Sequence, residues 1–305
     1  MKKLLLIDAN SIIHRSFHAL PNFTAPDGTP TGALYGVASI ILKLWKDDRP
    51  DFVAALFDRP EQTFREKKFV EYKAQRPATP DILISQLIET HNLFDAFGIS
   101  FFEKAGYEAD DLIATLATKF KDEKDLQIVI LTGDRDTLQL ISDDKIVVET
   151  FNKGVSDTTI YDEKKVMEKY GLPPRAIADY KALAGDPSDN IKGVPGIGPK
   201  TAIEILKKYG SVENIYKNID SDISLKNKLG KFKKEAEFSK ELVLLDKNVP
   251  IEDIKLSSLK SDYNREKILS YFKEKNFTAL IKRFDAYENE RLENTENKSV
   301  QGRMF

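Results

Sequence analysis

The stretch KLLLIDA at residues 3–9 is a short apolar run that ends in an aspartate. This is the pattern of a buried β-strand with a polar side chain at its carboxyl end. Two later stretches repeat it: FVAALFD at 52–58 ends in Asp58, and QIVILTGD at 127–134 ends in Asp134. Helical patterns such as ALYGVASIILKLWKDD separate the three runs. The alternation predicts an α/β fold with a mainly parallel sheet, and because parallel strands end at one edge, the aspartates should converge there.

The composition is that of a globular protein. The chain has 305 residues, of which 41% are hydrophobic and 31% charged, enough for one or two domains with a sizeable core. No apolar run approaches the roughly 20 residues of a membrane helix. The N-terminal run is broken by Asp8 and Asn10, which favours a strand over a signal peptide, so we expect a cytoplasmic protein. The absence of cysteine excludes disulfides, cysteine-ligated zinc and thiol catalysis.

Changes of character along the chain predict three parts. Residues 1–170 should form a catalytic α/β domain, with a polar, basic insertion at about 60–98 between two sheet elements. Residues 171–288 contain short helical patterns and Gly/Pro turns, which predict a helical module. Residues 289–305 are polar, and we expect a disordered tail there.

Carboxylates gather in three further motifs. GYEADD opens a helical pattern, TGDRD follows the third strand, and GDPSDN precedes a glycine-rich turn; together they supply Glu108, Asp110, Asp111, Asp134, Asp136, Asp186 and Asp189. Taken singly, the acids of GYEADD could stabilise a helix dipole, those of TGDRD could belong to an ordinary turn, and those of GDPSDN to a loop or a helix cap. With Asp8 and Asp58 they bring nine carboxylates to one sheet edge, where their mutual repulsion calls for bound cations.

This ligand set predicts the kind of chemistry. Oxygen ligands without cysteine suit Mg²⁺ or Mn²⁺. Two such ions could clamp the attacking and leaving oxygens of a phosphodiester and supply hydroxide near neutral pH. A histidine base is then not required, and we expect His14, His18 and His91 to be structural or to contact substrate.

The charge balance leaves room for a nucleic-acid partner. The net charge is −2, but without the nine clustered acids the 47 basic residues stand against 40 others, a surplus of seven. A protein that concentrates its acids around metal ions can present a basic face elsewhere.

Two segments carry features of DNA binding. The turn GVPGIGPKTA at 193–202 leads into a helical pattern, and its backbone N–H groups could hold a phosphate without reading sequence. The residues expected to contact DNA there are Gly193, Gly196, Gly198, Lys200 and Thr201. The insertion interleaves aromatic with basic side chains, among them Arg65, Tyr72, Lys73 and Arg76, which could stack on bases and neutralise phosphates. Its glutamates leave a solvated helix face as the alternative, and Arg15 could reach a phosphate or form a surface ion pair.

These stretches resemble a known family, the bacterial 5′→3′ exonuclease and flap endonuclease found as the N-terminal domain of DNA polymerase I. The matching segments are LLLIDANSIIHRSFHAL, FDRPEQTFREKKFVEYKAQR, GYEADDLIATLA, LTGDRDTLQLI and ALAGDPSDNIKGVPGIGPKTA, in the family's order. The resemblance covers roughly residues 1–285. It implies a PIN-like central sheet, a helical arch in the insertion, and a helix–hairpin–helix-like module that grips duplex DNA.

The resemblance also implies site residues and a reaction. The nine acids would hold two metal ions; Arg15, Arg65, Lys73 and Arg76 would contact phosphates, Lys73 and Arg76 beside the reacting bond; and the turn Gly193–Gly198 could hold K⁺. The reaction would be hydrolysis near single-strand/double-strand junctions at 5′ flaps and 5′ ends of DNA, RNA primer–DNA hybrids included. The implied setting is primer removal from Okazaki fragments and DNA repair in the bacterial nucleoid, by a monomer with a DNA polymerase in cis or in trans.

Three alternatives stay open at this point. The chain could be a DNA-junction binding module without catalysis, although all nine acids are present. It could be a ribonuclease of the PIN-like fold, although the basic insertion and the GVPGIGPKTA turn favour DNA. It could also be either a free-standing nuclease or a fragment of a longer polymerase.

Overall fold

A six-stranded sheet forms the centre of the protein. The computed structural model describes residues 1–143, 145–154 and 157–301. The strands are β1 (Lys2–Asp8), β2 (Phe52–Phe57), β3 (Ser100–Glu103), β4 (Leu126–Thr132), β5 (Ile146–Lys153) and β6 (Asp157–Tyr161). Their order is β3-β2-β1-β4-β5-β6; the first five run parallel, and β6 runs antiparallel to β5. The expected α/β fold with a mainly parallel sheet is confirmed.

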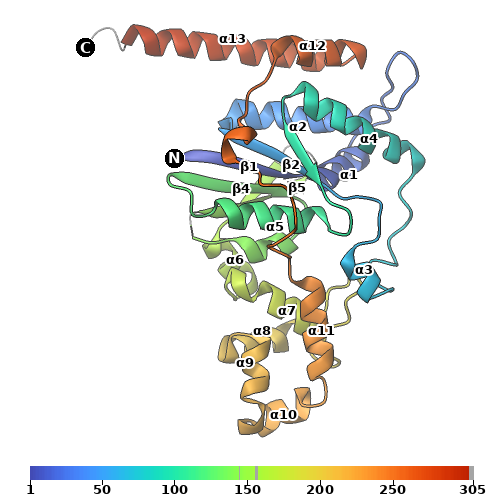
Figure 1. The fold of residues 1–305 in the computed structure, drawn as a ribbon, viewed down its shortest axis with the longest axis vertical. Helices are drawn as coiled ribbons and strands as arrows, with labels where there is room; N and C mark the ends of the chain where they lie inside the picture. Colours follow the sequence, from blue (N-terminus) through green and yellow to red (C-terminus); the bar gives the residue numbers. More distant parts are fainter. Residues whose placement is uncertain (144, 155–156, 302–305) are drawn as a thin grey trace.

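Helices cover both faces of this sheet (Figure 1). On one face lie α1 (Ala9–Ala19), α2 (Gly32–Asp48), α4 (Asp81–Ala96), α12 (Arg265–Glu274) and α13 (Thr278–Gln301). On the other lie α5 (Ala109–Phe120) and α6 (Glu163–Tyr170). Alternate strand residues enter the two cores: Leu5 and Ile7 join the first, Leu4 and Leu6 the second. Burial on both faces explains why β1, β2 and β4 are continuous apolar runs.

A helical module with its own core extends below the sheet (Figure 1). Its helices are α7 (Ile177–Ala184), α8 (Pro199–Tyr209), α9 (Val212–Lys217), α10 (Ile223–Leu229) and α11 (Lys233–Val243). The motif GDPSDN and the glycine-rich turn join α7 to α8. Carboxylate oxygens of Asp186 and Asp189 in this loop lie within 4.8 Å of Asp136, which follows β4, so the loop faces the carboxyl end of that strand.

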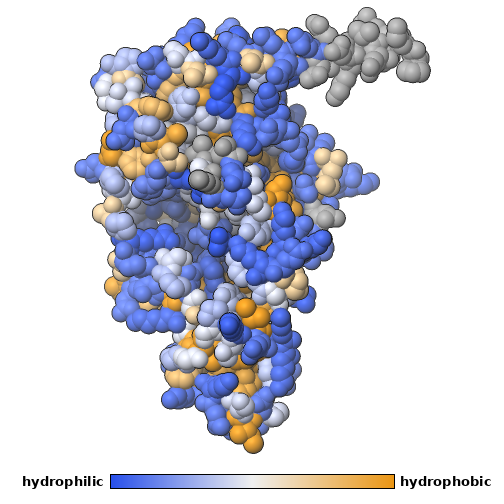
Figure 2. Space-filling view, turned by 180° about the vertical axis from the view of Figure 1, so that it is seen from behind, coloured by the Kyte–Doolittle hydropathy of each residue, from blue (hydrophilic) through white to orange (hydrophobic). Residues whose placement is uncertain are grey.

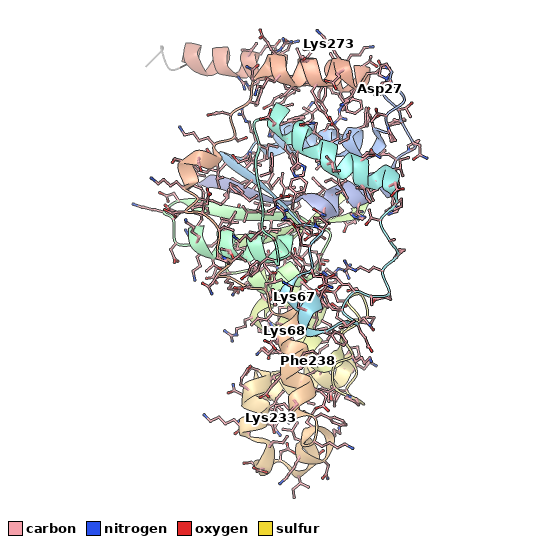
Figure 3. The ribbon with its side chains drawn as sticks, turned by 45° about the vertical axis from the view of Figure 1, so that its right-hand side comes forward. Asp27, Lys67, Lys68, Lys233, Phe238 and Lys273 are labelled. Carbon is pink, nitrogen blue, oxygen red and sulfur yellow. The ribbon has the colours of Figure 1, made fainter. Side chains whose placement is uncertain are left out.

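The insertion at 60–98 bridges the sheet body and the module. It begins with the five-residue helix α3 (Phe64–Lys68), which a capping box at Thr63 starts, and ends with α4 against α1 and α2. Figure 3 shows Lys67 and Lys68 of α3 above Phe238 and Lys233 of α11, and the rings of Phe69 and Phe238 are 5.7 Å apart. Residues 69–80 connect the two helices without regular structure. Passage of a DNA strand through this segment stays a prediction.

The expectation of a disordered tail is wrong for residues 289–301. Helix α13 runs from Thr278 to Gln301, and residues 302–305 lie outside the described part. Its first turns are docked, because Leu280 and Phe284 are fully buried in the sheet core. Extending an existing helix costs far less than starting one, and no glycine or proline interrupts residues 278–301.

In the described residues, no helix is both long and apolar enough to cross a membrane. Figure 2 shows a face that is largely hydrophilic, with its hydrophobic residues in small separate patches, and that is hollowed near the middle.

Candidate active site

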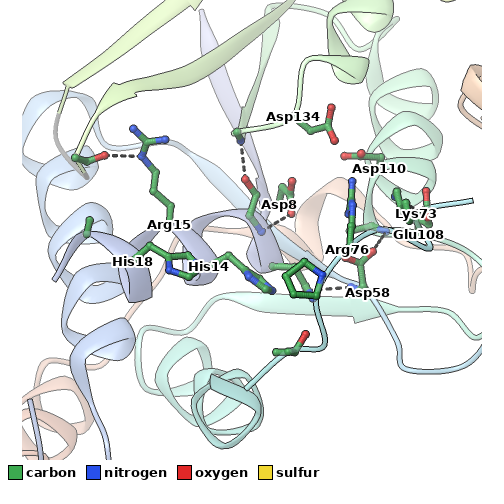
Figure 4. A pocket seen from close by; sticks show the side chains of 18 residues that line it. Asp8, His14, Arg15, His18, Asp58, Lys73, Arg76, Glu108, Asp110 and Asp134 are labelled. Atoms are coloured by element: carbon green, nitrogen blue, oxygen red, sulfur yellow. Dashed lines mark hydrogen bonds and ion pairs between the residues drawn. The ribbon is translucent and has the colours of Figure 1, made fainter. Parts of the chain in front are cut away.

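A pocket of about 990 Å³ opens beside the carboxyl ends of the central strands. Five of the nine expected acids line it, as Figure 4 shows: Asp8, Asp58, Glu108, Asp110 and Asp134. They come from the ends of β1, β2 and β4 and the start of α5. The parallel topology thus collects residues that are more than 120 positions apart in the sequence.

Hydrogen bonds fix these carboxylates in place. Asp8 caps α1 by accepting from Ser11 N at 2.9 Å, and its second oxygen accepts from Thr132 Oγ1 at 2.6 Å. Asp58 Oδ1 accepts from Ala109 N, the first residue of α5, at 2.7 Å. Each bond joins two different elements, so the acids also tie the strand ends and helix starts together.

The pocket acids fit a divalent cation. Asp110 Oδ1 is buried and has no hydrogen-bond partner among the described residues. Burial and the neighbouring Asp58 raise the pKa of Asp8 to about 7, and burial and Asp134 raise the pKa of Asp110 well above its usual range. Carboxylates that are this crowded resist ionisation unless a cation offsets their charge.

We expect the metal-free protein to lose stability as pH rises from 3.8 to about 7. Because folding raises the pKa of Asp8, the folded state binds this proton more tightly than the unfolded chain, and the resulting stability is lost as Asp8 ionises. Urea unfolding in EDTA between pH 5 and 8 measures this, and Mg²⁺ should remove the loss. Asp8→Asn should flatten the profile. The raised pKa of Asp8 would be contradicted if the stability of the wild type in EDTA rose with pH and if Asp8→Asn were less stable than the wild type.

Three further acids form a second group beside the pocket. One oxygen from each of Asp136, Asp186 and Asp189 lies within 4.8 Å of the others, and all three residues are buried. Lys181 of α7 forms ion pairs with Asp136 and Asp186. Burial alone would raise the pKa of Asp186, but the Lys181 ammonium beside it lowers that pKa. Arg76 Nη2 lies 2.7 Å from Asp189 Oδ1.

The ninth acid belongs to a buried structural pair. Asp111 is fully buried, and Arg65 donates to its two oxygens at 2.6 and 2.7 Å. Arg65 is 1% exposed and also donates to the carbonyls of Leu242 and Leu244. In this structure Arg65 and Asp111 bond to each other and to backbone groups inside the fold, and the phosphate contact at Arg65 and the metal ligand at Asp111 stay predictions.

The rest of the insertion's motif faces the acids. Tyr72 is 4% exposed and donates to Asp189 and Glu108 at 3.0 and 3.2 Å, and its contact with DNA stays a prediction. Lys73 Nζ lies 2.8 Å from Glu108 Oε1. Both Lys73 and Arg76 line the pocket beside its acids, as Figure 4 shows.

The opposite wall carries side chains of α1. Arg15, His14 and His18 line the pocket with Asn10 and Ser11. Arg15 is held by the Gly154 carbonyl and lies over the Phe151 ring, with its centroid 4.9 Å away. Arg15 thus lines the pocket, and its contact with a phosphate stays a prediction. Burial lowers the pKa of His14, which favours the neutral ring.

Sequence reasoning missed Lys181 and the side chains that hold Asp8. Lys181 stands five residues before Asp186, directly before the segment ALAGDPSDN, and a search for basic partners of each acid would have found it. Thr132 is the last residue of β4, and its hydroxyl donates to Asp8 at the end of the neighbouring strand β1. The alternation of side chains along β4 is the signal that could have predicted this contact.

The glycine-rich turn has the geometry of a tight hairpin before a helix. Gly193 has φ +65°, and a Cβ there would lie 2.3 Å from Gly185 N, so only glycine fits. Gly196 has φ +79°, and a Cβ on Gly196 or Gly198 would meet open space. Gly198 precedes α8 without a side-chain cap, which leaves the first N–H groups of that helix available to an anion. Lys200 and Pro199 are exposed beside them.

The sequence matches known families over most of its length. Residues 3–171 match the family described as 5′-3′ exonuclease, N-terminal resolvase-like domain, and residues 172–266 match the 5′-3′ exonuclease, C-terminal SAM fold. The 5′-3′ exonuclease of Aquifex aeolicus is 40% identical over 288 residues, which cover 93% of this chain and 96% of that protein. DNA polymerase I of Bacillus subtilis is 42% identical over 98% of this chain. The chain spans about a third of the length of the DNA polymerase I relatives it matches.

Solved structures share the fold. The bacteriophage T5 D15 flap endonuclease, in a pseudo-enzyme-product complex with DNA and metal ions, aligns with a TM-score of 0.64 and 20% identity, over 94% of this chain and all of that one. The catalytic core of Rad2 in complex with DNA substrate aligns with a TM-score of 0.56 and 17% identity, over 90% and 87%. The expected PIN-like architecture is confirmed.

Proposed function

The chain belongs to the 5′-3′ exonuclease family, and from that premise we propose that it hydrolyses DNA phosphodiester bonds at 5′ ends and 5′ flaps with two divalent metal ions. The observation that carries the proposal is the arrangement of eight carboxylates. Five line one pocket, three form a neighbouring group, and Arg76 is shared by both regions. Ligands divided in this way suit a pair of ions that hold one phosphate between them.

Each group has a distinct part in the proposed reaction. Asp8, Asp58, Glu108, Asp110 and Asp134 would hold one ion, and Asp136, Asp186 and Asp189 would hold the other. The bound ions, Mg²⁺ or Mn²⁺, supply an activated water and stabilise charge on the leaving oxygen. Lys73 and Arg76 stand beside the acids, where they can hold the scissile phosphate by its non-bridging oxygens. Arg15 on the opposite wall can hold the next phosphate of the strand.

The same geometry supports DNA as the substrate. The turn Gly193–Thr201 offers backbone N–H groups and an exposed lysine, which fit a phosphate backbone of any sequence. This turn follows the GDPSDN loop directly, so a duplex held there would direct one strand end to the pocket. Four residues of the segment 69–80 line the pocket (Lys73, Arg76, Pro77 and Thr79), so this segment would clamp or enclose the 5′ single strand.

A cleavage assay tests the reaction and the substrate class together. A labelled DNA 5′ flap should be cut near the junction in Mg²⁺ and stay intact in EDTA, with 3′-hydroxyl and 5′-phosphate products. If the flap is not cut in Mg²⁺ or Mn²⁺, the alternative of a DNA-junction binding module without catalysis would be favoured. Faster cutting of single-stranded RNA than of the DNA flap would favour a PIN-like ribonuclease instead.

We expect Lys200→Ala to weaken binding to duplex DNA by about the same factor for every sequence. Removing one phosphate contact should also reduce the slope of log affinity against log salt by about one unit. Fluorescence anisotropy at several salt concentrations in EDTA measures both quantities. Lys124→Ala is the matched control, because Lys124 is exposed in the loop before β4, at the opposite edge of the sheet. An unchanged slope for Lys200→Ala would reject the contact.

The biological setting follows from the same proposal. Cutting at 5′ flaps and at RNA primer–DNA junctions would serve primer removal from Okazaki fragments and DNA repair in the bacterial nucleoid. A DNA polymerase would act with it, in cis or in trans, and the nuclease would work as a monomer. A K⁺ ion at the Gly193–Gly198 turn belongs to this proposal as well.

A further inference from the structure

The second carboxylate group contains a cation that belongs to the protein. The Lys181 side chain projects from α7 and contacts both Asp136 and Asp186, with Nζ 2.6 Å from Asp186 Oδ2. Asp189 completes the group, and Arg76 pairs with it from the exposed side. Lys73 Nζ lies 3.9 Å from Asp189 as well, so the three carboxylates face three protein cations. One of these, Lys181, is 16% exposed and sits among the ligand oxygens themselves.

This ammonium and a divalent ion would compete for one place. The three acids offer oxygens within 4.8 Å of one another, close enough for one ion of the size of Mg²⁺ or Mn²⁺ to touch all three. Lys181 uses oxygens of two of these acids. An ion bound there would take the same lone pairs, and it would stand within a few ångströms of the ammonium, in a buried setting where like charges repel strongly.

The pocket group also has protein cations, but at one acid: Glu108 pairs with Lys73 at 2.8 Å and with Arg65 at 3.2 Å. Among the described residues, Asp110 Oδ1 is buried without a hydrogen-bond partner, and the oxygens of Asp8 accept from the uncharged Ser11 and Thr132. An ion can enter there without displacing a cation from Asp110 or Asp8. The two groups are therefore unequal before any ion or DNA arrives.

We propose that Lys181 is an internal counter-ion that keeps the second metal site closed until its ammonium is drawn away. The inference rests on the proposed function, since it concerns the second of the two ions. By linkage, an anion that takes Lys181 from Asp136 and Asp186 raises the affinity of this group for metal, and metal in turn favours that anion. A DNA phosphate is the anion that the proposed function supplies. Lys181 lies on the helix that leads to the Gly193–Thr201 turn, so DNA binding and filling of the second site are coupled.

Titration of the metal-free 305-residue chain with Mn²⁺ in the absence of DNA tests the inference. Free Mn²⁺ is followed by electron paramagnetic resonance, so the readout is binding and not activity. The wild type should bind one ion tightly and a second weakly. In Lys181→Met, which removes the charge and keeps the bulk of the chain, the second ion should bind at least about tenfold more tightly. Equal affinity for the second ion in both proteins overturns the proposal.

A matched control separates this effect from the loss of any buried lysine. Lys240 on α11 also bridges two carboxylates, at 2.6 Å from Asp179 and 2.8 Å from Glu213, but neither belongs to the metal groups. Lys240→Met should leave both Mn²⁺ affinities unchanged. A tenfold gain in Lys240→Met as well would assign the effect to loosening of the module and overturn the proposal.

Folding and function are kept apart in the outcomes. If Lys181→Met is unfolded without metal, Mn²⁺ should restore its circular dichroism spectrum, because the ion replaces the missing cation; failure to restore it overturns the proposal. If the wild type cuts flaps but binds both ions as tightly as Lys181→Met does, the proposed function stands and this inference is overturned. If the wild type binds no Mn²⁺, both are overturned.

Discussion

Replacing Asp134 with asparagine should abolish cleavage and leave DNA binding largely intact. Asp134 lines the pocket opposite Asp110, and its Oδ1 accepts from Asp136 N at 2.8 Å. Asparagine keeps that acceptor, so the loop after β4 should hold its shape. The change removes one negative charge from a metal ligand, and the loss of several kcal/mol of transition-state stabilisation corresponds to a rate at least about 10³-fold lower.

Two measurements decide this prediction. Single-turnover cleavage of a 5′ flap in Mg²⁺ gives the rate, and anisotropy in EDTA gives the affinity for the same DNA. Asp122→Asn makes the same chemical change at an exposed residue in the loop before β4, at the other edge of the sheet, and should cut normally. Asp134→Asn with near-normal cleavage would remove the residue from the metal site. Loss of binding together with cleavage would point to a role in the fold.

Arg65→Met should destabilise the whole protein by about 3–5 kcal/mol, because it leaves the carboxylate of Asp111 buried and unpaired. Arg65 is 1% exposed and Asp111 fully buried. The guanidinium also satisfies the carbonyls of Leu242 and Leu244, so it joins the insertion and α5 to the segment after α11. Its removal breaks the connection between the sheet body and the helical module at one point.

Urea unfolding in EDTA measures the effect. Lys67→Met, two residues away on the exposed side of α3, should change the free energy of unfolding by less than about 0.5 kcal/mol. The double variant Arg65→Met/Asp111→Asn should be less destabilised than the sum of its parts, since it no longer buries an unpaired charge. If Arg65→Met unfolds like the wild type but binds DNA poorly, the phosphate contact expected from the sequence would be supported.

Local sequence patterns were sufficient for the three central strands and for the edge where the site lies, but not for β3, β5 and β6. Strands β1, β2 and β4 are apolar runs buried on both faces, and an acid follows or ends each of them, so Asp8, Asp58 and Asp134 could be brought together without a structure. The glycine pattern at 193–198 also predicted a tight turn. The structure agrees, because Gly193 has a positive φ and no room for a side chain.

The partner of each charged side chain was decided only by the tertiary structure. Arg65 and Arg76 stand in the same basic segment, yet Arg65 turns inward to Asp111 and Arg76 reaches Asp189 at the edge of the pocket. Lys181 comes from a helix that the sequence marks as ordinary, and it stands among three carboxylates. Composition and spacing tell which residues are charged and which strand end they follow. They do not tell which oppositely charged side chain will lie within 3 Å of a given residue. That depends on how elements more than 40 residues apart in the sequence pack together.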